Sequence, residues 1–191
     1  MIKAILCVAG GLALTAALTA RGAAERAPGD GPQFTADGQM RFPKEYREWV
    51  FLSSGLGMTY GPAAAETRDE PRFDNVFVNR SAYKSFLASG RWPDKTVFIL
   101  EIRKSQSEGS INKGGHFQTS AAAIEVHVKD QKRFKGDWAF FGFGEGKETA
   151  KQIPASASCY SCHRDHGAVD TTFVQFYPTL LDAAKANHTL R

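Results

Sequence analysis

The sequence predicts a single, sheet-rich α+β domain. Three segments have the β-branched and aromatic composition of strands, and two others have the apolar spacing of helices. The 191 residues show no internal repeat, and the 42% hydrophobic and 12% aromatic content suffices for one packed core. We therefore expect one domain over residues 40–191.

In the N-terminal half of the domain, strand and helix patterns alternate. Residues 46–52 (YREWVFL) are aromatic and apolar and predict a short helix or strand. Residues 73–79 (FDNVFVN) alternate apolar and polar side chains, as a half-buried strand does. Residues 81–89 (SAYKSFLAS) have helical spacing, with Ser81 as the expected N-cap and Gly90 as the residue that ends the helix.

The C-terminal half contains the clearest strands. They are residues 96–103 (TVFILEIR), 121–128 (AAAIEVHV) and 137–143 (DWAFFGF). The polar residues 144–158 predict an irregular segment, and the tail from residue 171 ends with a helical pattern that begins near Pro178.

An export signal precedes the domain. Lys3 is followed by an apolar run over residues 4–20 and then by small residues, so a signal peptide is expected over residues 1–24, with cleavage after Ala20 or Ala24. Residues 25–39 are rich in Gly, Ala and Pro and predict a flexible lead. An uncleaved membrane anchor is the alternative, although the run is at the short end of a membrane span. The expected location is periplasmic.

The charge distribution excludes nucleic-acid binding. The net charge of +4 comes from 24 basic and 20 acidic residues, and no run of Lys or Arg concentrates it. Such a mild basic surplus would suit an acidic redox partner, for example another cytochrome, or only a solvated surface.

Residues 159–163 (CYSCH) match the c-type haem attachment signature. Two thiols three residues apart reach the two vinyl groups on one edge of a porphyrin, and the adjacent histidine ligates the iron. We therefore predict one covalent haem c, attached through Cys159 and Cys162, with His163 as an axial iron ligand. The motif is expected in a loop after the sheet.

Three other interpretations of the cysteines are weaker. A zinc site would need Cys159, Cys162, His163 and His166, but structural zinc sites usually draw on two separated ligand pairs. A disulfide would suit the spacing in an exported protein, but the cysteines of a C-x-x-C-H motif are more often bound to haem. A thioredoxin-like redox pair is weaker still, because no βαβ pattern surrounds the motif.

The second axial position decides the chemistry, because a Met or His ligand makes an electron carrier and an open position binds small molecules. None of the candidates has a distinctive setting. His127 alternates with Glu125 on a predicted strand, which favours a half-exposed surface pair. His166 is too close to His163 to reach the opposite side. The candidates are Met40, Met58, His116, His127, His166 and His188.

Segments spread over most of the mature chain are typical of one family of haem proteins. They are residues 43–50 (PKEYREWV), 76–78 (VFV) with Tyr83, 96–97 (TV) leading into Glu101, 124–126 (IEV), 138–141 (WAFF), the CYSCH motif and 172–178 (TFVQFYP). Through them the chain resembles the cytochrome P-460 family, which includes the cytochromes c′-beta. The resemblance implies a mainly antiparallel β-sheet domain with flanking helices, a homodimer, and a haem that is five-coordinate through His163.

One position departs from the family pattern. Hydroxylamine-oxidising members tie a lysine covalently to the haem, and that lysine directly precedes a glutamate in the strand that matches residues 96–103. Here Leu100 precedes Glu101, and its alkyl side chain has no nucleophilic nitrogen. Lys95 and Lys104 are near in sequence, but Lys104 lies about 13 Å further along the strand.

The alternation places Phe98, Leu100 and Ile102 on one face of their strand. If that face looks at the haem, its distal side is apolar; otherwise these side chains only fill the core. An apolar pocket resembles that of the cytochromes c′-beta, which favour nitric oxide and carbon monoxide over water or anions.

Three functions follow. The first is an exported haem protein that binds nitric oxide at an open iron position. The second is an enzyme that oxidises hydroxylamine or nitric oxide, with Glu101, Glu125 or His127 as acid or base. The third is an electron-transfer cytochrome with a sixth protein ligand.

Overall fold

The computed structural model describes residues 29–60 and 70–191, so the predicted signal peptide lies outside the described residues. The fold is α+β with antiparallel strand pairing, as predicted, and the described residues form three α-helices. Within the described part of the chain, no helix is long and apolar enough to cross a membrane. The elements in chain order are β1 (Met40–Arg41), η1 (Lys44–Glu48), β2 (Val50–Leu56), β3 (Phe73–Val78), α1 (Arg80–Ser89), β4 (Val97–Gln106), β5 (Phe117–Lys129), β6 (Trp138–Phe143), β7 (Thr149–Ala150), α2 (Ser158–His166), η3 (Val174–Phe176) and α3 (Pro178–Ala186).

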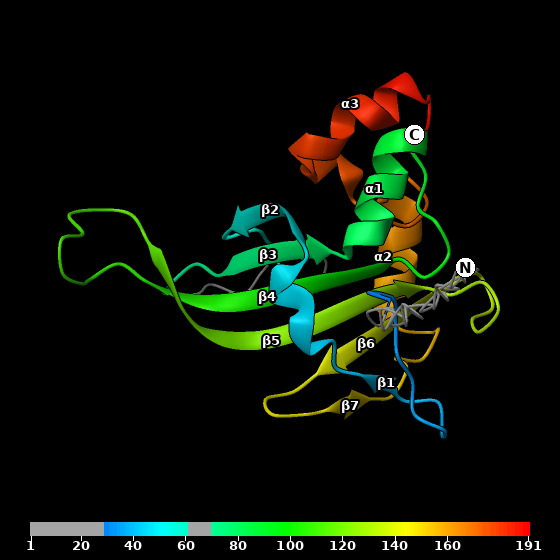
Figure 1. Cartoon of the computed structure of the whole chain (residues 1–191). Coiled ribbons are helices and arrows are strands. Elements are labelled where there is room, and N and C mark those ends of the chain that lie inside the picture. Colours follow the sequence, from blue (N-terminus) through cyan, green and yellow to red (C-terminus); the bar gives the residue numbers. More distant parts are fainter. Residues whose placement is uncertain (1–28, 61–69) are drawn as a thin grey trace, which may run out of the picture.

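A five-stranded sheet in the order β2-β3-β4-β5-β6 forms the centre of the molecule, and β1 pairs with β7 beside it. The hairpin of β4 and β5 extends away from the helices, which gather at the other end of the sheet (Figure 1). In the register of this hairpin, Phe98 lies opposite His127, and Leu100 lies opposite Glu125. This register decides which side chains meet on each face.

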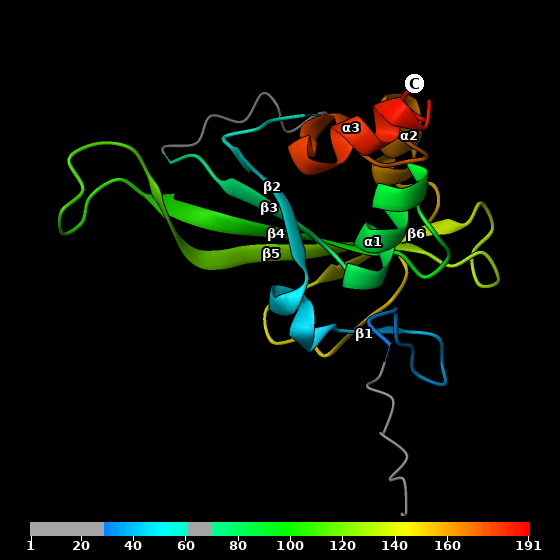
Figure 2. The same ribbon diagram turned by 45° about the horizontal axis from the view of Figure 1, so that its top comes forward.

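Each face of the sheet is covered by its own apolar core. On one face, Phe98 packs in a cluster with Phe86 of α1 and Leu180 of α3. On the other face, the neighbouring Ile99 packs in a cluster with Met40 of β1 and Tyr46 of η1. Because successive side chains of a strand point to opposite faces, the two cores alternate along β4. Figure 2 shows α1 and α3 on the side of the sheet away from β1.

The predicted strands are confirmed, with shifted ends, while the segment 46–52 divides between η1 and β2. The glycine that ends α1 is also as predicted, since Gly90 has a φ of 64° in the left-handed region. Pro178 occupies the start of α3.

The predicted N-cap of α1 is wrong, because Asn79 occupies that position. Ser81 lies inside the helix, and its backbone N–H donates to the Asp30 carboxylate at 2.8 Å. An acceptor distant in the sequence thus serves an N–H group of the first turn, which local sequence cannot reveal. Residues from Gly29 onward also pack on the domain, since the Phe34 ring contacts those of Phe134 and Phe141.

Candidate haem site

The CYSCH motif lies in helix α2, so the expected loop is wrong. Residues 158–166 contain neither Gly nor Pro, so nothing interrupts the helix before Gly167. Positions three and four residues apart share one side of a helix. The side chains of Cys159, Cys162 and His163 therefore leave α2 on the same side.

The side chain of Tyr160 joins α2 to the sheet. Its hydroxyl donates to the carbonyl oxygen of Ile153 at 3.0 Å and accepts from the backbone N–H of Phe140 at 3.4 Å. The rings of Tyr160 and Phe140 also meet edge to face, with centroids 4.9 Å apart. These contacts hold the motif against β6.

The geometry of His163 leaves one ring nitrogen available for a metal. Its Nδ1 lies 2.7 Å from the carbonyl oxygen of Thr171. A carbonyl can only accept, so Nδ1 carries the proton, and Nε2 of the neutral ring keeps its lone pair. Burial lowers the pKa of His163, although the bond to Thr171 opposes this shift. The ring is thus kept in the neutral form in which histidine binds metals.

Side-chain hydrogen bonds hold the loop that carries the Thr171 carbonyl. The indole N–H of Trp92 donates to the Thr172 hydroxyl at 2.8 Å, and that hydroxyl donates to the carbonyl of Val169 at 2.7 Å. The Lys129 ammonium donates to the carbonyl of Trp92 at 3.0 Å and to the Asp170 carboxylate at 3.1 Å. This network fixes the position of the acceptor for His163.

His127 is buried, and the expected half-exposed surface pair is wrong. Its ring stacks on Phe140 with centroids 4.1 Å apart and meets the His163 ring at 4.8 Å. Alternation along a strand shows which residues share a face but not where a helix covers that face. Here α2 covers the strand at His127, whereas Glu125 stays exposed. Burial lowers the pKa of His127 well below its usual range, and the electrostatic interaction with the neighbouring His163 lowers it further by a smaller amount.

The face of β4 that carries Phe98, Leu100 and Ile102 is the face on which α2 lies, since Phe98 and His127 are cross-strand neighbours. Phe98 belongs to the core, with its ring centroid 4.7 Å from that of Trp92. Leu100 and Ile102 are only half-buried. Phe98 is thus a core residue, whereas Leu100 and Ile102 remain accessible. They lie on the face of the sheet that α2 and its CYSCH motif cover, which we call the motif side.

Glu125 lies beside Leu100 on this face and close to the motif. Burial raises the pKa of the Cys159 thiol, and the Glu125 carboxylate adds to that shift. The pKa of Glu125 is itself raised, because surrounding protein atoms desolvate the carboxyl even though part of it reaches the surface. Of the acid or base candidates, Glu125 and His127 therefore lie on the motif side.

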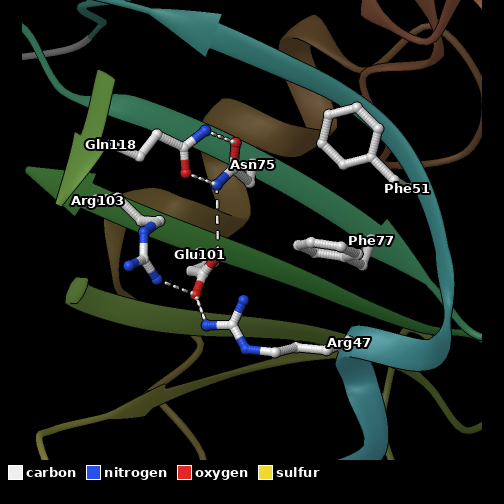
Figure 3. Close-up of a pocket in the computed structure, with 7 residues that line it drawn as sticks. All are labelled: Arg47, Phe51, Asn75, Phe77, Glu101, Arg103 and Gln118. Atoms are coloured by element: carbon white, nitrogen blue, oxygen red, sulfur yellow. Dashed lines mark hydrogen bonds and ion pairs between the residues drawn. The ribbon is translucent and has the colours of Figure 1, made fainter. Parts of the chain in front are cut away.

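Glu101 points to the opposite face. Its carboxylate accepts from the Tyr46 hydroxyl at 2.9 Å, from Arg103 at 2.9 Å, from Asn75 at 3.3 Å and from Arg47. Of these residues, Arg47, Asn75 and Arg103 line a pocket of about 480 Å³ together with Glu101, drawn in Figure 3. No sequence pattern indicates this cluster, because its members come from η1, β3 and β4 and meet only in the folded chain.

Other interpretations of the motif find no support in its geometry. Among residues 29–60 and 70–191, no group of three or more His, Cys, Asp or Glu side chains could hold a metal ion, which disfavours the zinc site. Cys159 and Cys162 are not joined by a disulfide. The raised pKa of Cys159 is the opposite of what a redox-active cysteine pair needs.

The donor set fits a c-type haem. Two free, half-buried thiols and a neutral imidazole with an available Nε2 project from one side of α2. Aromatic rings surround the imidazole, with centroids at 4.7 Å for Phe140 and 4.4 Å for Phe173. Apolar surroundings of this kind suit a porphyrin.

Comparison with known families agrees with this geometry. A model of the family described as Cytochrome P460 matches residues 43–174, a span that includes the five-stranded sheet and α2. A search of curated proteins finds no match.

Proposed function

Because the chain belongs to the cytochrome P460 family, which implies a haem cofactor, we propose that it is a mono-haem c-type cytochrome that binds small gaseous ligands such as nitric oxide. Cys159 and Cys162 form the thioether bonds, and His163 Nε2 is the axial iron ligand. When bound, the haem supplies an open iron coordination position for the gas.

The choice of ligand rests on the apolar side chain of Leu100. It lies on the motif side of β4. By the resemblance described above, its position before Glu101 corresponds to that of the haem-linked lysine in the hydroxylamine-oxidising members of the family. Its cross-strand neighbour on β3 is Val76, and Ile102 follows on the same face. These side chains offer no nucleophile and no proton donor, so they favour a weakly polar diatomic molecule over water or an anion.

The positions of three other candidate ligands support an open iron position. Met40 is fully buried in the core on the opposite face of the sheet. His127 contacts the His163 ring directly, so a haem does not fit between the two. His116 is paired with Glu70 at 2.9 Å near the end of the β4–β5 hairpin. A sixth ligand from these residues would require a large rearrangement.

The visible absorption spectrum of the purified ferrous protein, before and after addition of nitric oxide, tests the proposal. We expect a five-coordinate, high-spin spectrum with an ordinary c-haem Soret band that shifts when the gas is added. A six-coordinate, low-spin spectrum that does not respond would make the protein an electron carrier. A ferrous band displaced far to the red would reveal a crosslinked haem and contradict the role of Leu100.

Glu125 favours a second candidate, the oxidation of hydroxylamine or nitric oxide. Its carboxyl has a raised pKa and lies beside Leu100 on the motif side, where it is able to accept a proton from a bound substrate. This activity would appear as reduction of an electron acceptor on addition of hydroxylamine, and it would fall in the variant Glu125→Gln. Without turnover in the unmodified protein, the binding function stands alone.

Export and dimerisation are part of the proposal. The apolar run before the domain would direct the chain to the periplasm, where c-type haem is attached, and cell fractionation tests this. The homodimer expected from the family is tested by the molar mass in solution.

A further inference from the structure

The pocket around Glu101 lies on the face of the sheet opposite α2, so the haem proposal does not use it. Its polar residues are Arg47 of η1, Asn75 of β3, Glu101 and Arg103 of β4, and Gln118 of β5. Figure 3 shows their side chains converging from these elements, with Phe51 and Phe77 forming a separate wall. The volume of about 480 Å³ is in the range of sites for small organic molecules.

The charged groups of this pocket do not balance. Glu101 is 1% exposed, and its hydrogen bonds together with the two arginines hold its pKa below the usual value, although burial alone would raise it. It therefore remains ionised at neutral pH. Two guanidinium groups, of Arg47 and Arg103, face this one carboxylate, which leaves one positive charge in excess.

The two arginines have different roles. Arg103 is 21% exposed and is held by both Glu101 and the carbonyl of Thr119, so it serves the structure. Arg47 is 58% exposed, and within the described residues its only side-chain hydrogen bond is to Glu101. A guanidinium group has five N–H donors in a planar fork that suits a carboxylate. Arg47 therefore has donors left for a ligand.

The apolar wall limits the shape of that ligand. The rings of Phe51 and Phe77 meet edge to face at 5.6 Å, and Phe51 is 50% exposed although it is aromatic. A flat, apolar body would cover these rings, as aromatic side chains cover one another in protein interiors. The carboxamides of Asn75 and Gln118 form two hydrogen bonds with each other, of 2.7 and 3.1 Å. They close the side of the pocket opposite Arg47 (Figure 3).

We propose that this pocket binds an organic monoanion with a flat apolar body, such as an aromatic carboxylate. The carboxylate pairs with the outer edge of the Arg47 guanidinium and neutralises the excess charge. The ring packs on Phe51 and Phe77. This site is independent of the haem and of its gaseous ligand.

Titration of the full haem-containing protein with sodium benzoate, followed by calorimetry at low ionic strength, tests the proposal. We expect saturable binding at one site per chain without a change in the visible haem spectrum. Arg47→Gln should weaken binding about tenfold or more, and Phe51→Ala, which leaves the ion pairs of Glu101 in place, about threefold or more. Nitrate, which has the charge but no ring, should bind about tenfold more weakly than benzoate.

Lys44→Gln is the matched control. Lys44 also belongs to η1, and it is exposed and paired with Glu148 at 2.7 Å outside the pocket. This variant removes the same charge as Arg47→Gln, so it should change the affinity by less than about twofold. An equal loss in both variants would mean diffuse attraction and overturn the proposal. Equal affinities for nitrate and benzoate, a benzoate-induced change in the haem spectrum, or no saturable binding would also overturn it.

Discussion

The imidazole Nδ1 of His163 donates a hydrogen bond to the carbonyl oxygen of Thr171 over 2.7 Å. This contact fixes the tautomer of the ring and joins the haem motif to a loop that Trp92 and Lys129 hold in place. An axial histidine that is restrained in this way keeps its orientation and gains basicity. With the proposed haem bound, the properties of the iron would therefore depend on residues outside the CYSCH motif.

Replacing His163 with Ala should remove the axial ligand and leave both thioether bonds, because Cys159 and Cys162 are unchanged. The covalent haem content should stay near that of the unmodified protein, while the five-coordinate histidine spectrum of the ferrous form disappears. Absorption spectroscopy and a denaturing haem stain measure the two effects. His166→Ala, on an exposed residue of the same helix, is the control and should change neither. An unaltered spectrum in His163→Ala would contradict the ligand assignment.

Gly167→Ala should destabilise the site. An added Cβ would lie 2.6 Å from the carbonyl oxygen of His163 and 2.8 Å from the backbone nitrogen of Thr172, and both are backbone atoms that cannot move aside alone. We expect a loss of about 1–3 kcal/mol in the free energy of unfolding and a change in the ferrous spectrum, since the His163–Thr171 contact must shift. Denaturant unfolding and absorption spectra measure these effects. In Gly114→Ala, where nothing lies within 4 Å of the added Cβ, both should stay unchanged. The same small effect in both variants would show that the loop is not tightly packed.

Leu100→Lys should restore the nitrogen that the family's crosslink requires. We expect a ferrous band displaced to the red and some turnover of hydroxylamine, because residue 100 lies on the motif side of β4. Mass spectrometry of the haem peptide measures the crosslink. Leu100→Met, which keeps an apolar side chain of similar volume, should give neither effect. Unchanged spectra and activity in Leu100→Lys would count against the position assigned to this residue.

Glu101→Gln should change how the free energy of unfolding depends on pH. The folded-state pKa of Glu101 is lowered from 4.5, because bonds from Tyr46, Asn75 and the arginines outweigh the opposing effect of burial. The ionised Glu101 carboxylate therefore stabilises the folded state fully above the unfolded-state pKa of 4.5. This stabilisation is lost as the pH falls below 4.5 and through the lower folded-state pKa.

At neutral pH the free energy of unfolding of this variant should be roughly 2–4 kcal/mol lower than that of the unmodified protein, because two arginines lose their buried partner. Below pH 4.5 the difference from the unmodified protein should shrink. Denaturant unfolding at several pH values measures both. Glu148→Gln, which breaks an exposed ion pair with Lys44, is the control and should have little effect at any pH. A difference for Glu101→Gln that is constant with pH would contradict the ionised state of Glu101.

Sequence patterns identified the helices, strands and helix ends that are determined by their own residues and immediate neighbours. The strand at residues 96–103 has β-branched and aromatic residues throughout, and the structure confirms it as β4. Gly90 ends α1 because it adopts a conformation that other residues rarely do. By contrast, the N-cap at Asn79 and the burial of His127 depend on contacts with distant segments.

The sequence by itself determined the chemistry that this chain has available: two thiols and an imidazole at the spacing of a c-type haem, and an alkyl side chain at position 100 beside a carboxylate at 101. Only the tertiary structure decided where these groups point. Alternation along a strand assigns residues to two faces without distinguishing the faces. The packing of α2 beside His127 placed Leu100 on the motif side, and the bond from Tyr46 placed Glu101 on the other. Such long-range contacts form only when the chain is folded, so no local pattern contains them.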